Sequence, residues 1–196
     1  MDSALGLWME DNAELFKYVS ELPAISGKSD RILLSGGASA LLAGVFGILC
    51  PEADIVAVDS NMDILADASS ECGSLNIINS PFDAYLADES YDLIVSALQI
   101  QSLNTRELTP YLFNLYDNLG KGGALYLSFP DAVAPTVMEK NLYPSWYSMY
   151  EEVYLKYYMS DDVVNALSLI GFEIKAIEAD NNEDLGHVVS LLCVKR

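Results

Sequence analysis

The chain has 196 residues and a formal net charge of −19, because 29 acidic side chains stand against 10 basic ones. This length suits one domain spanning residues 1–196, and 52% hydrophobic residues exclude a disordered chain. A surface this acidic repels phosphate backbones and anionic lipid headgroups, so we expect no nucleic-acid and no membrane partner. Solubility or a salty habitat would explain the same charge.

Side chains that usually bind metals are scarce. Cys50, Cys72 and Cys193 are widely spaced, and His187 is the single histidine. This set indicates neither a disulfide framework nor a zinc site, so we predict no metal. The first residues lack the basic segment of a signal peptide, and the longest apolar stretch, 38–50, is too short to cross a bilayer. We therefore expect a cytoplasmic protein.

The first predicted element is a helix. Apolar residues recur at helical spacing over 7–22, and Pro23 is expected to end the helix. We assign residues 1–29 to an N-terminal cap helix, which would cover part of a binding pocket.

Buried strands and helices alternate along the rest of the chain. The strands are expected at 32–34, 55–58, 75–78, 91–96, 124–129, 172–177 and 188–194. The helices are expected at 39–50, from 62 to about 73, at 108–119 and at 161–169. Ser160 is the expected N-cap of the last helix, and Gly120 and Gly171 are expected just past the ends of the last two.

This alternation predicts an α/β fold. It is typical of a Rossmann-like, doubly wound, mostly parallel seven-stranded sheet with helices on both faces. The last two strands are joined by the short polar stretch 179–184, which predicts an antiparallel C-terminal hairpin. Such sheets bind ligands at the carboxyl ends of their strands. Four clusters are expected there, at 35–39, 59–61, 80–82 and 96–101.

The first cluster joins a strand to a helix. Gly36 and Gly37, between Ser35 and Ala38, would let a ligand approach the backbone, and the following helix offers free N–H groups. A glycine pair in such a turn also occurs without any ligand.

Asp59 ends the next strand, about 20 residues after Gly37, the spacing of a ribose-binding acid. Its two oxygens match a vicinal diol and would accept charge-assisted hydrogen bonds from it. The alternative is structural, because Asp59 and Ser60 could cap the helix that begins near Met62. We favour ribose binding.

Several segments resemble the motifs of class I S-adenosylmethionine (SAM)-dependent methyltransferases, in the order that the family has them. Residues 32–40 look like the glycine-rich first motif, and Ala57-Val58-Asp59 looks like the second. The later segments with such a likeness are 79–82 with 88–96, 119–125 and 171–173. The resemblance covers about residues 30–196.

The resemblance implies SAM as cofactor, S-adenosylhomocysteine (SAH) as product and methyl transfer to a small-molecule acceptor. The cofactor-binding residues that it implies are Ser35, Gly36, Gly37, Ala38, Asp59, Ser60, Ser80, Pro81, Phe82, Ser96 and Ala97. Ser35 and Ser80 replace acids of the family, Ser39 and Leu41 replace glycines, and Ser102 replaces a frequent histidine.

Methyl transfer displaces a neutral leaving group from an already activated donor, so it depends mainly on alignment. We therefore assign no catalytic residue. Tyr91, Tyr126 and Asp131 are the candidates for a base, although each has a simpler packing or turn role.

Residues 131–160 are predicted to form an aromatic lid or insertion. In the resembled family this region often borders the acceptor, so Trp146, Tyr147 and Tyr150 are the predicted substrate-binding residues. Tyrosines at helical spacing would equally cover the core or form a homodimer contact.

Two other functions stay open. The altered first motif is compatible with a methyltransferase-like binding or partner subunit that lacks catalysis. A nicotinamide-dependent Rossmann enzyme would also use Asp59, but the residues after Gly37 do not continue Gly-x-Gly-x-x-Gly, and no Tyr-x-x-x-Lys pair stands in a fitting place.

Overall fold

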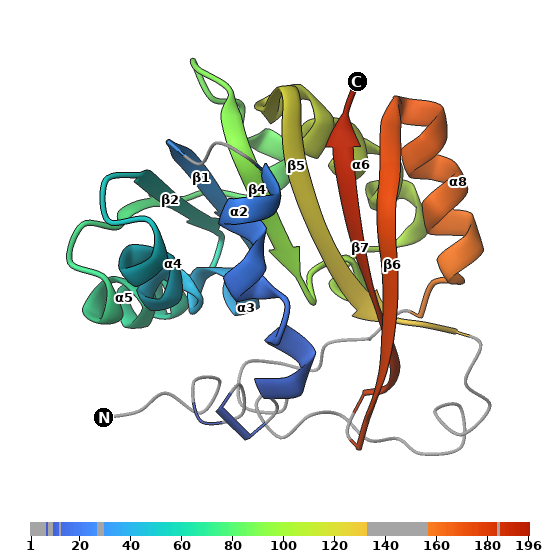
Figure 1. Cartoon of the computed structure of the whole chain (residues 1–196), viewed down its shortest axis with the longest axis horizontal. Coiled ribbons are helices and arrows are strands. Elements are labelled where there is room, and N and C mark those ends of the chain that lie inside the picture. Colours follow the sequence, from blue (N-terminus) through green and yellow to red (C-terminus); the bar gives the residue numbers. More distant parts are fainter. Residues whose placement is uncertain (1–6, 8–9, 12, 27–29, 133–156, 184) are drawn as a thin grey trace.

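The computed structural model describes residues 7, 10–11, 13–26, 30–132, 157–183 and 185–196. Its centre is a seven-stranded sheet with the order β3-β2-β1-β4-β5-β7-β6 (Figure 1). The strands are β1 (Arg31–Ser35), β2 (Asp54–Asp59), β3 (Asn76–Asn79), β4 (Tyr91–Ala97), β5 (Leu119–Pro130), β6 (Phe172–Asn182) and β7 (Gly186–Lys195). Strands β1 to β5 pair in parallel, whereas β7 is antiparallel to β5 and β6. The predicted fold class is confirmed.

Helices cover both faces of the sheet. The helical elements are η1 (Ala13–Phe16), η2 (Val19–Glu21), α2 (Leu22–Ser26), α3 (Gly37–Ala40), α4 (Ala43–Leu49), α5 (Met62–Glu71), η3 (Phe82–Ala84), η4 (Ile100–Ser102), α6 (Thr105–Asn118) and α8 (Ser160–Ile170). The N-terminal segments and α3 to α5 share one apolar core, and η3, α6 and α8 share the other. None of the described helices is long and apolar enough to cross a membrane.

The alternating direction of side chains along β1 determines which way Ser35, its last residue, points. Ile32 and Leu34 point into the first core, and Leu33 points into the second. Because successive side chains of a strand point to opposite faces, Ser35 shares the face of Leu33 and meets α6. The last side chain of β1 is thereby turned toward the helix layer that contains α6.

The N-terminal cap differs from its prediction. Its residues 13–26 form three short helical segments instead of one helix, and Pro23 lies in the first turn of α2 instead of ending a helix. Proline is tolerated there because the first turn of a helix has no internal partner for its N–H groups.

Two predicted helix signals were also wrong. Gly120 lies inside β5, because α6 ends at Asn118 and the next residue pairs directly with β4. Ser160 is the first residue of α8, and its hydroxyl donates to Asp131 instead of capping the helix. Gly171, with φ of 125°, ends α8 as predicted.

A lysine of β7 caps the C-terminal end of α6 by binding carbonyl oxygens there. The ammonium of Lys195 donates to the carbonyl oxygens of Tyr116 and Leu119, each at 2.7 Å. At the other end, Asn104 and Glu107 form a capping box that lies before the predicted start of the helix. Both contacts satisfy backbone groups at the ends of α6.

Two further boundaries moved. The helix predicted at 39–50 divides into α3 and α4, with a turn at residues 41–42. Strand β6 continues through Asn182, so most of the polar stretch 179–184 is strand and the link between β6 and β7 is shorter than expected.

Candidate functional site

The turn after β1 has the backbone that a glycine requires. Gly36 has φ of 87°, in the left-handed region that other residues avoid, and its N–H donates to the carbonyl oxygen of Val58 at 3.0 Å. Helix α3 begins at Gly37. The ends of β1 and β2 are thereby joined at the carboxyl edge of the sheet.

Asp59 and Gly37 meet at this edge. A Cβ on Gly37 would lie 3.8 Å from Asp59 Oδ2 and 2.9 Å from Ile64 Cδ1, so only glycine fits without displacing Ile64. Asp59 Oδ1 accepts a hydrogen bond from the N–H of Asn61 at 2.6 Å. Burial raises the pKa of Asp59, while backbone N–H groups of Asn61, Gly37 and Ser60 act to lower it.

The N-cap of α5 is Asn61, not Asp59 or Ser60. The side-chain oxygen of Asn61 accepts hydrogen bonds from the N–H groups of Asp63 and Ile64, at 3.0 and 3.4 Å. The structural alternative for Asp59 is therefore wrong in its stated form. The carboxylate keeps acceptor capacity for a ligand, since a carboxylate offers about four lone-pair directions.

Ser35 and Ser96, at the ends of β1 and β4, are bridged by Tyr111 of α6. The Tyr111 hydroxyl lies 2.8 Å from Ser35 Oγ and 2.6 Å from Ser96 Oγ. All three residues are buried, and burial raises the pKa of Tyr111 to about 12. Phe82 packs on the Tyr111 ring at a centroid distance of 5.0 Å. These hydroxyls bind one another and hold the strand ends to α6.

Ser39 and Ala97 make a second internal link. The N–H of Ala97 donates to Ser39 Oγ at 2.7 Å, and both residues are fully buried. Ser39 stands where the resembled family has a glycine. Its hydroxyl ties α3 to the end of β4, which gives this departure a structural reason.

Gln99 covers the glycine turn. Its side-chain amide occupies the space that a Cβ on Gly36 would need. Gln99 follows Leu98, a non-glycine residue with φ of 49°, a conformation that costs about 1 kcal/mol or more. The amide nitrogen donates to Ser102 Oγ at 3.3 Å, and the Ser102 hydroxyl donates back to the Gln99 carbonyl at 2.7 Å.

The remaining predicted cofactor residues lie beside Asp59. Ser60 and Pro81 are exposed, Ser80 is half-buried and Phe82 is buried. The Ser80 N–H donates to the carbonyl oxygen of Asp59 at 3.1 Å, so the ends of β2 and β3 are joined. The structure thus brings the first three predicted clusters together around Asp59.

The three candidate bases lie in different places. Tyr91 begins β4, at the opposite edge of the sheet, and its hydroxyl contacts that of Tyr85 at 2.6 Å. Tyr126 lies inside β5 with its hydroxyl near Ser190. Asp131 follows β5 at the carboxyl edge, but its buried carboxylate accepts hydrogen bonds from Ser160. Tyr91 is therefore too far along its strand to serve the site.

The predicted acceptor residues Trp146, Tyr147 and Tyr150 lie outside the described residues. Sequence reasoning also missed two side chains that shape the site. Tyr111 was hidden because it occupies an apolar position of an amphipathic helix. Gln99 lay within a named cluster, and its position directly after a buried strand was the available signal.

The strand order, the C-terminal hairpin and the joined strand ends together define the class I SAM-dependent methyltransferase fold. No protein-family model and no curated protein matches the chain. Solved structures match it over nearly its whole length. At identities this low, the likeness shows the fold.

Three of these structures illustrate the match. N-methyltransferase NodS from Bradyrhizobium japonicum WM9, in complex with SAH, has 15% identity and a TM-score of 0.68, covering 99% of this chain and 89% of that one. Magnesium protoporphyrin IX methyltransferase from Synechocystis PCC 6803, with bound SAH, has 13% identity, a TM-score of 0.73 and coverages of 94% and 84%. The 1,6-didemethyltoxoflavin-N1-methyltransferase from Burkholderia thailandensis, with 1,6-didemethyltoxoflavin and SAH bound, has 15% identity, a TM-score of 0.73 and coverages of 96% and 80%.

Proposed function

We propose that the protein transfers the methyl group of SAM to a small-molecule acceptor. The observation that carries this proposal is the approach of Asp59 to the Gly37 turn, on a fold whose solved examples include several with bound SAH. Asp59 would accept hydrogen bonds from the ribose hydroxyls, and the backbone of Gly36 to Ala38 would lie along the donor.

The other cofactor residues take two roles. Ser60, Ser80 and Pro81 surround Asp59 and would contact the nucleoside, with Phe82 packed behind them. The second role is structural. Ser35 and Ser96 hydrogen-bond to Tyr111, and the N–H of Ala97 donates to Ser39, so these buried residues support the turn without contacting the ligand.

SAM would supply the activated methyl group, so the chain has to hold the donor, align the acceptor and exclude water. Trp146, Tyr147 and Tyr150 remain the predicted residues for the acceptor. Gln99 has to leave Gly36 before the methionine part of SAM can lie on that turn.

A methyltransferase-like binding subunit without catalysis is the second candidate. The observation that favours it is the Gln99 amide on Gly36, because a side chain in this position competes with a ligand. The buried hydroxyl of Ser35 points the same way, since it bonds to Tyr111 instead of taking over the role of the family's acid.

Calorimetry of the full chain with SAM, SAH and NAD tests these functions. Methyl transfer predicts binding of SAM and SAH and no binding of NAD. If neither sulfur compound binds at millimolar concentration, the methyltransferase proposal is wrong and the binding-subunit candidate gains. Binding of NAD alone would point to nicotinamide chemistry.

A further inference from the structure

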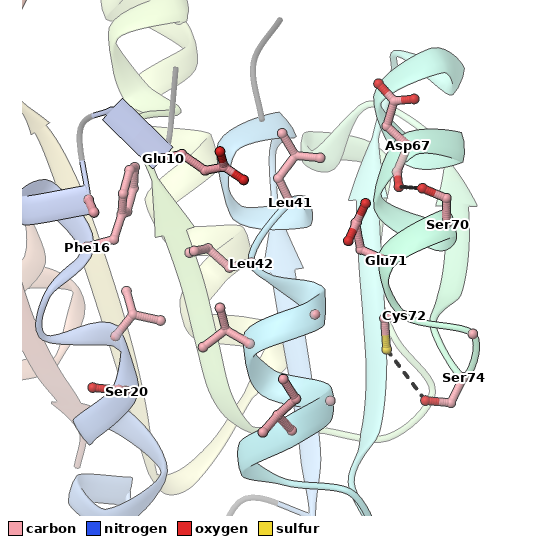
Figure 2. A pocket seen from close by; sticks show the side chains of 17 residues that line it. Glu10, Phe16, Ser20, Leu41, Leu42, Asp67, Ser70, Glu71, Cys72 and Ser74 are labelled. Carbon is pink, nitrogen blue, oxygen red and sulfur yellow. Dashed lines mark hydrogen bonds between the residues drawn. The ribbon is translucent and has the colours of Figure 1, made fainter. Parts of the chain in front are cut away.

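A groove with a volume of about 830 Å³ lies on the face of the sheet that α4 covers (Figure 2). Helix α4 forms its floor, the N-terminal segment forms one wall, and the end of α5 with the turn after it forms the other. No residue that lines it belongs to the four clusters at the strand ends. The groove is therefore separate from the proposed SAM site.

The floor of the groove is apolar and carries no charge. Val45 and Ile48 of α4 are 39% and 81% exposed, although no charged residue occurs anywhere in 32–50. A helix surface that faces water normally carries polar or charged side chains, so this uncharged exposed surface suits the apolar part of a ligand.

Two glycines of α4 face the end of α5 beside this floor. A Cβ on Gly47 would lie 3.0 Å from Cys72 Sγ, and one on Gly44 would lie 3.5 Å from Glu71 Cβ. The absence of a side chain at Gly47 lets the end of α5 lie close to α4, whereas a Cβ on Gly44 would only make ordinary contact. The wall on this side therefore stands directly beside the apolar floor.

The walls of the groove are acidic. Glu10 contributes a carboxylate from one side of α4, and Asp67 and Glu71 contribute two from α5 on the other (Figure 2). No lysine, arginine or histidine is among the described residues that line the groove. Its electrostatic potential therefore favours a cation.

We infer that this groove binds a small organic cation with an apolar body, such as an arylalkylamine. The apolar body would lie on Val45 and Ile48, and the ammonium group would lie beside the wall carboxylates. The volume lies within the usual range of small-molecule sites, about 300–1,000 Å³. A second copy of this chain fits less well, since it would bring another strongly acidic surface to three carboxylates.

Three matched compounds test the charge requirement: phenylbutylamine, phenylbutanol and phenylbutyrate. We expect the full chain to bind the amine with a Kd of about 1 mM, as is typical for so small a ligand, and to bind the alcohol more weakly. The carboxylate should not bind measurably. Binding is followed by ligand-observed NMR, and rising salt should weaken binding of the amine.

Variants locate the binding. Asp67→Asn combined with Glu71→Gln should weaken amine binding about three- to tenfold, because each neutralised carboxylate removes one exposed ion pair. Asp88→Asn combined with Glu52→Gln makes the same charge change at exposed sites outside the groove and should leave binding unchanged.

The floor has its own pair of variants. Ile48→Ser should weaken amine binding about threefold or more, whereas Leu169→Ser, which removes a similarly exposed apolar side chain from α8, should not. Equal affinity in all variants, tighter binding of phenylbutyrate than of the amine, or no amine binding at millimolar concentration would overturn the proposal. Titration with SAM tests the proposed methyltransferase function independently of the groove, because the two sites share no residue.

Discussion

The two sides of the sheet edge at which β1 ends use opposite chemistry. On the β2 side, the carboxyl group of Asp59 lies beside Gly37, and burial raises its pKa. On the β4 side, Ser35 and Ser96 are neutral and share hydrogen bonds with Tyr111. The β2 side thus holds a partly buried carboxyl group that can still accept hydrogen bonds. On the β4 side the polar side chains hydrogen-bond to one another.

This difference teaches which side binds and which side supports. Partial burial of a carboxylate costs free energy that the fold does not need to spend, so its presence indicates a function, whereas a closed hydroxyl network stabilises the fold at low electrostatic cost. We therefore expect substitutions on the β2 side to change ligand affinity and those on the β4 side to change stability.

The largest effect is expected for Asp59→Ala. The substitution should weaken SAH binding by about 1.5–3 kcal/mol, tenfold or more, because a hydrogen bond to a charged group has that value. Calorimetry measures the affinity, and circular dichroism checks the fold. Asp63→Ala, which removes an exposed carboxylate four residues away, is the control. Unchanged affinity in a folded Asp59→Ala protein would remove the ribose role.

Tyr111→Phe should act on stability instead. It leaves two buried serine hydroxyls without their partner, so we expect a loss of about 1–3 kcal/mol in the free energy of unfolding, measured with urea. Adding Ser35→Ala and Ser96→Ala to this variant should cost little more or recover stability, because the unpaired hydroxyls are then gone. A full additive loss would contradict the network.

Gln99→Ala tests the side chain that lies on the Gly36 turn, between the β2 and β4 sides. Removing the amide from Gly36 should tighten SAH binding about two- to tenfold, since the ligand no longer has to displace the amide and break its hydrogen bond to Ser102, worth about 1 kcal/mol. Ser102→Ala removes the hydroxyl that holds this amide and should give a smaller gain. Weaker binding by Gln99→Ala would show instead that the amide contacts the ligand.

The smallest effect concerns pH. Because burial raises the pKa of Asp59 in the folded state, its contribution to stability is greatest below its unfolded pKa and falls as pH rises through the folded pKa. Asp59→Asn should therefore be at least as stable as the parent at neutral pH, as urea unfolding at several pH values can show. SAH affinity should change in the opposite direction. It should fall in the parent protein as pH is lowered toward the pKa of Asp59, and it should stay flat in the variant.

Much of the architecture was predictable from local patterns. The buried strands that end at Ser35 and Asp59 are continuous apolar runs between turn residues, and such runs have one stable place in an α/β sheet. The Gly37-to-Asp59 spacing correctly predicted that the two residues meet. Helix boundaries were less predictable, because Pro23 and Gly120 fit more than one local structure.

The amino-acid sequence by itself determined the layered α/β fold, the strand edge at which its polar clusters meet and the position of Asp59 there. The fold, this edge and Asp59 at it follow from periodicity and spacing, which are properties of the chain alone. Only the tertiary structure decided that Tyr111 bridges Ser35 and Ser96 and that Gln99 covers Gly36. Those contacts join side chains from separate elements, and their partners are set by packing, which no local pattern encodes.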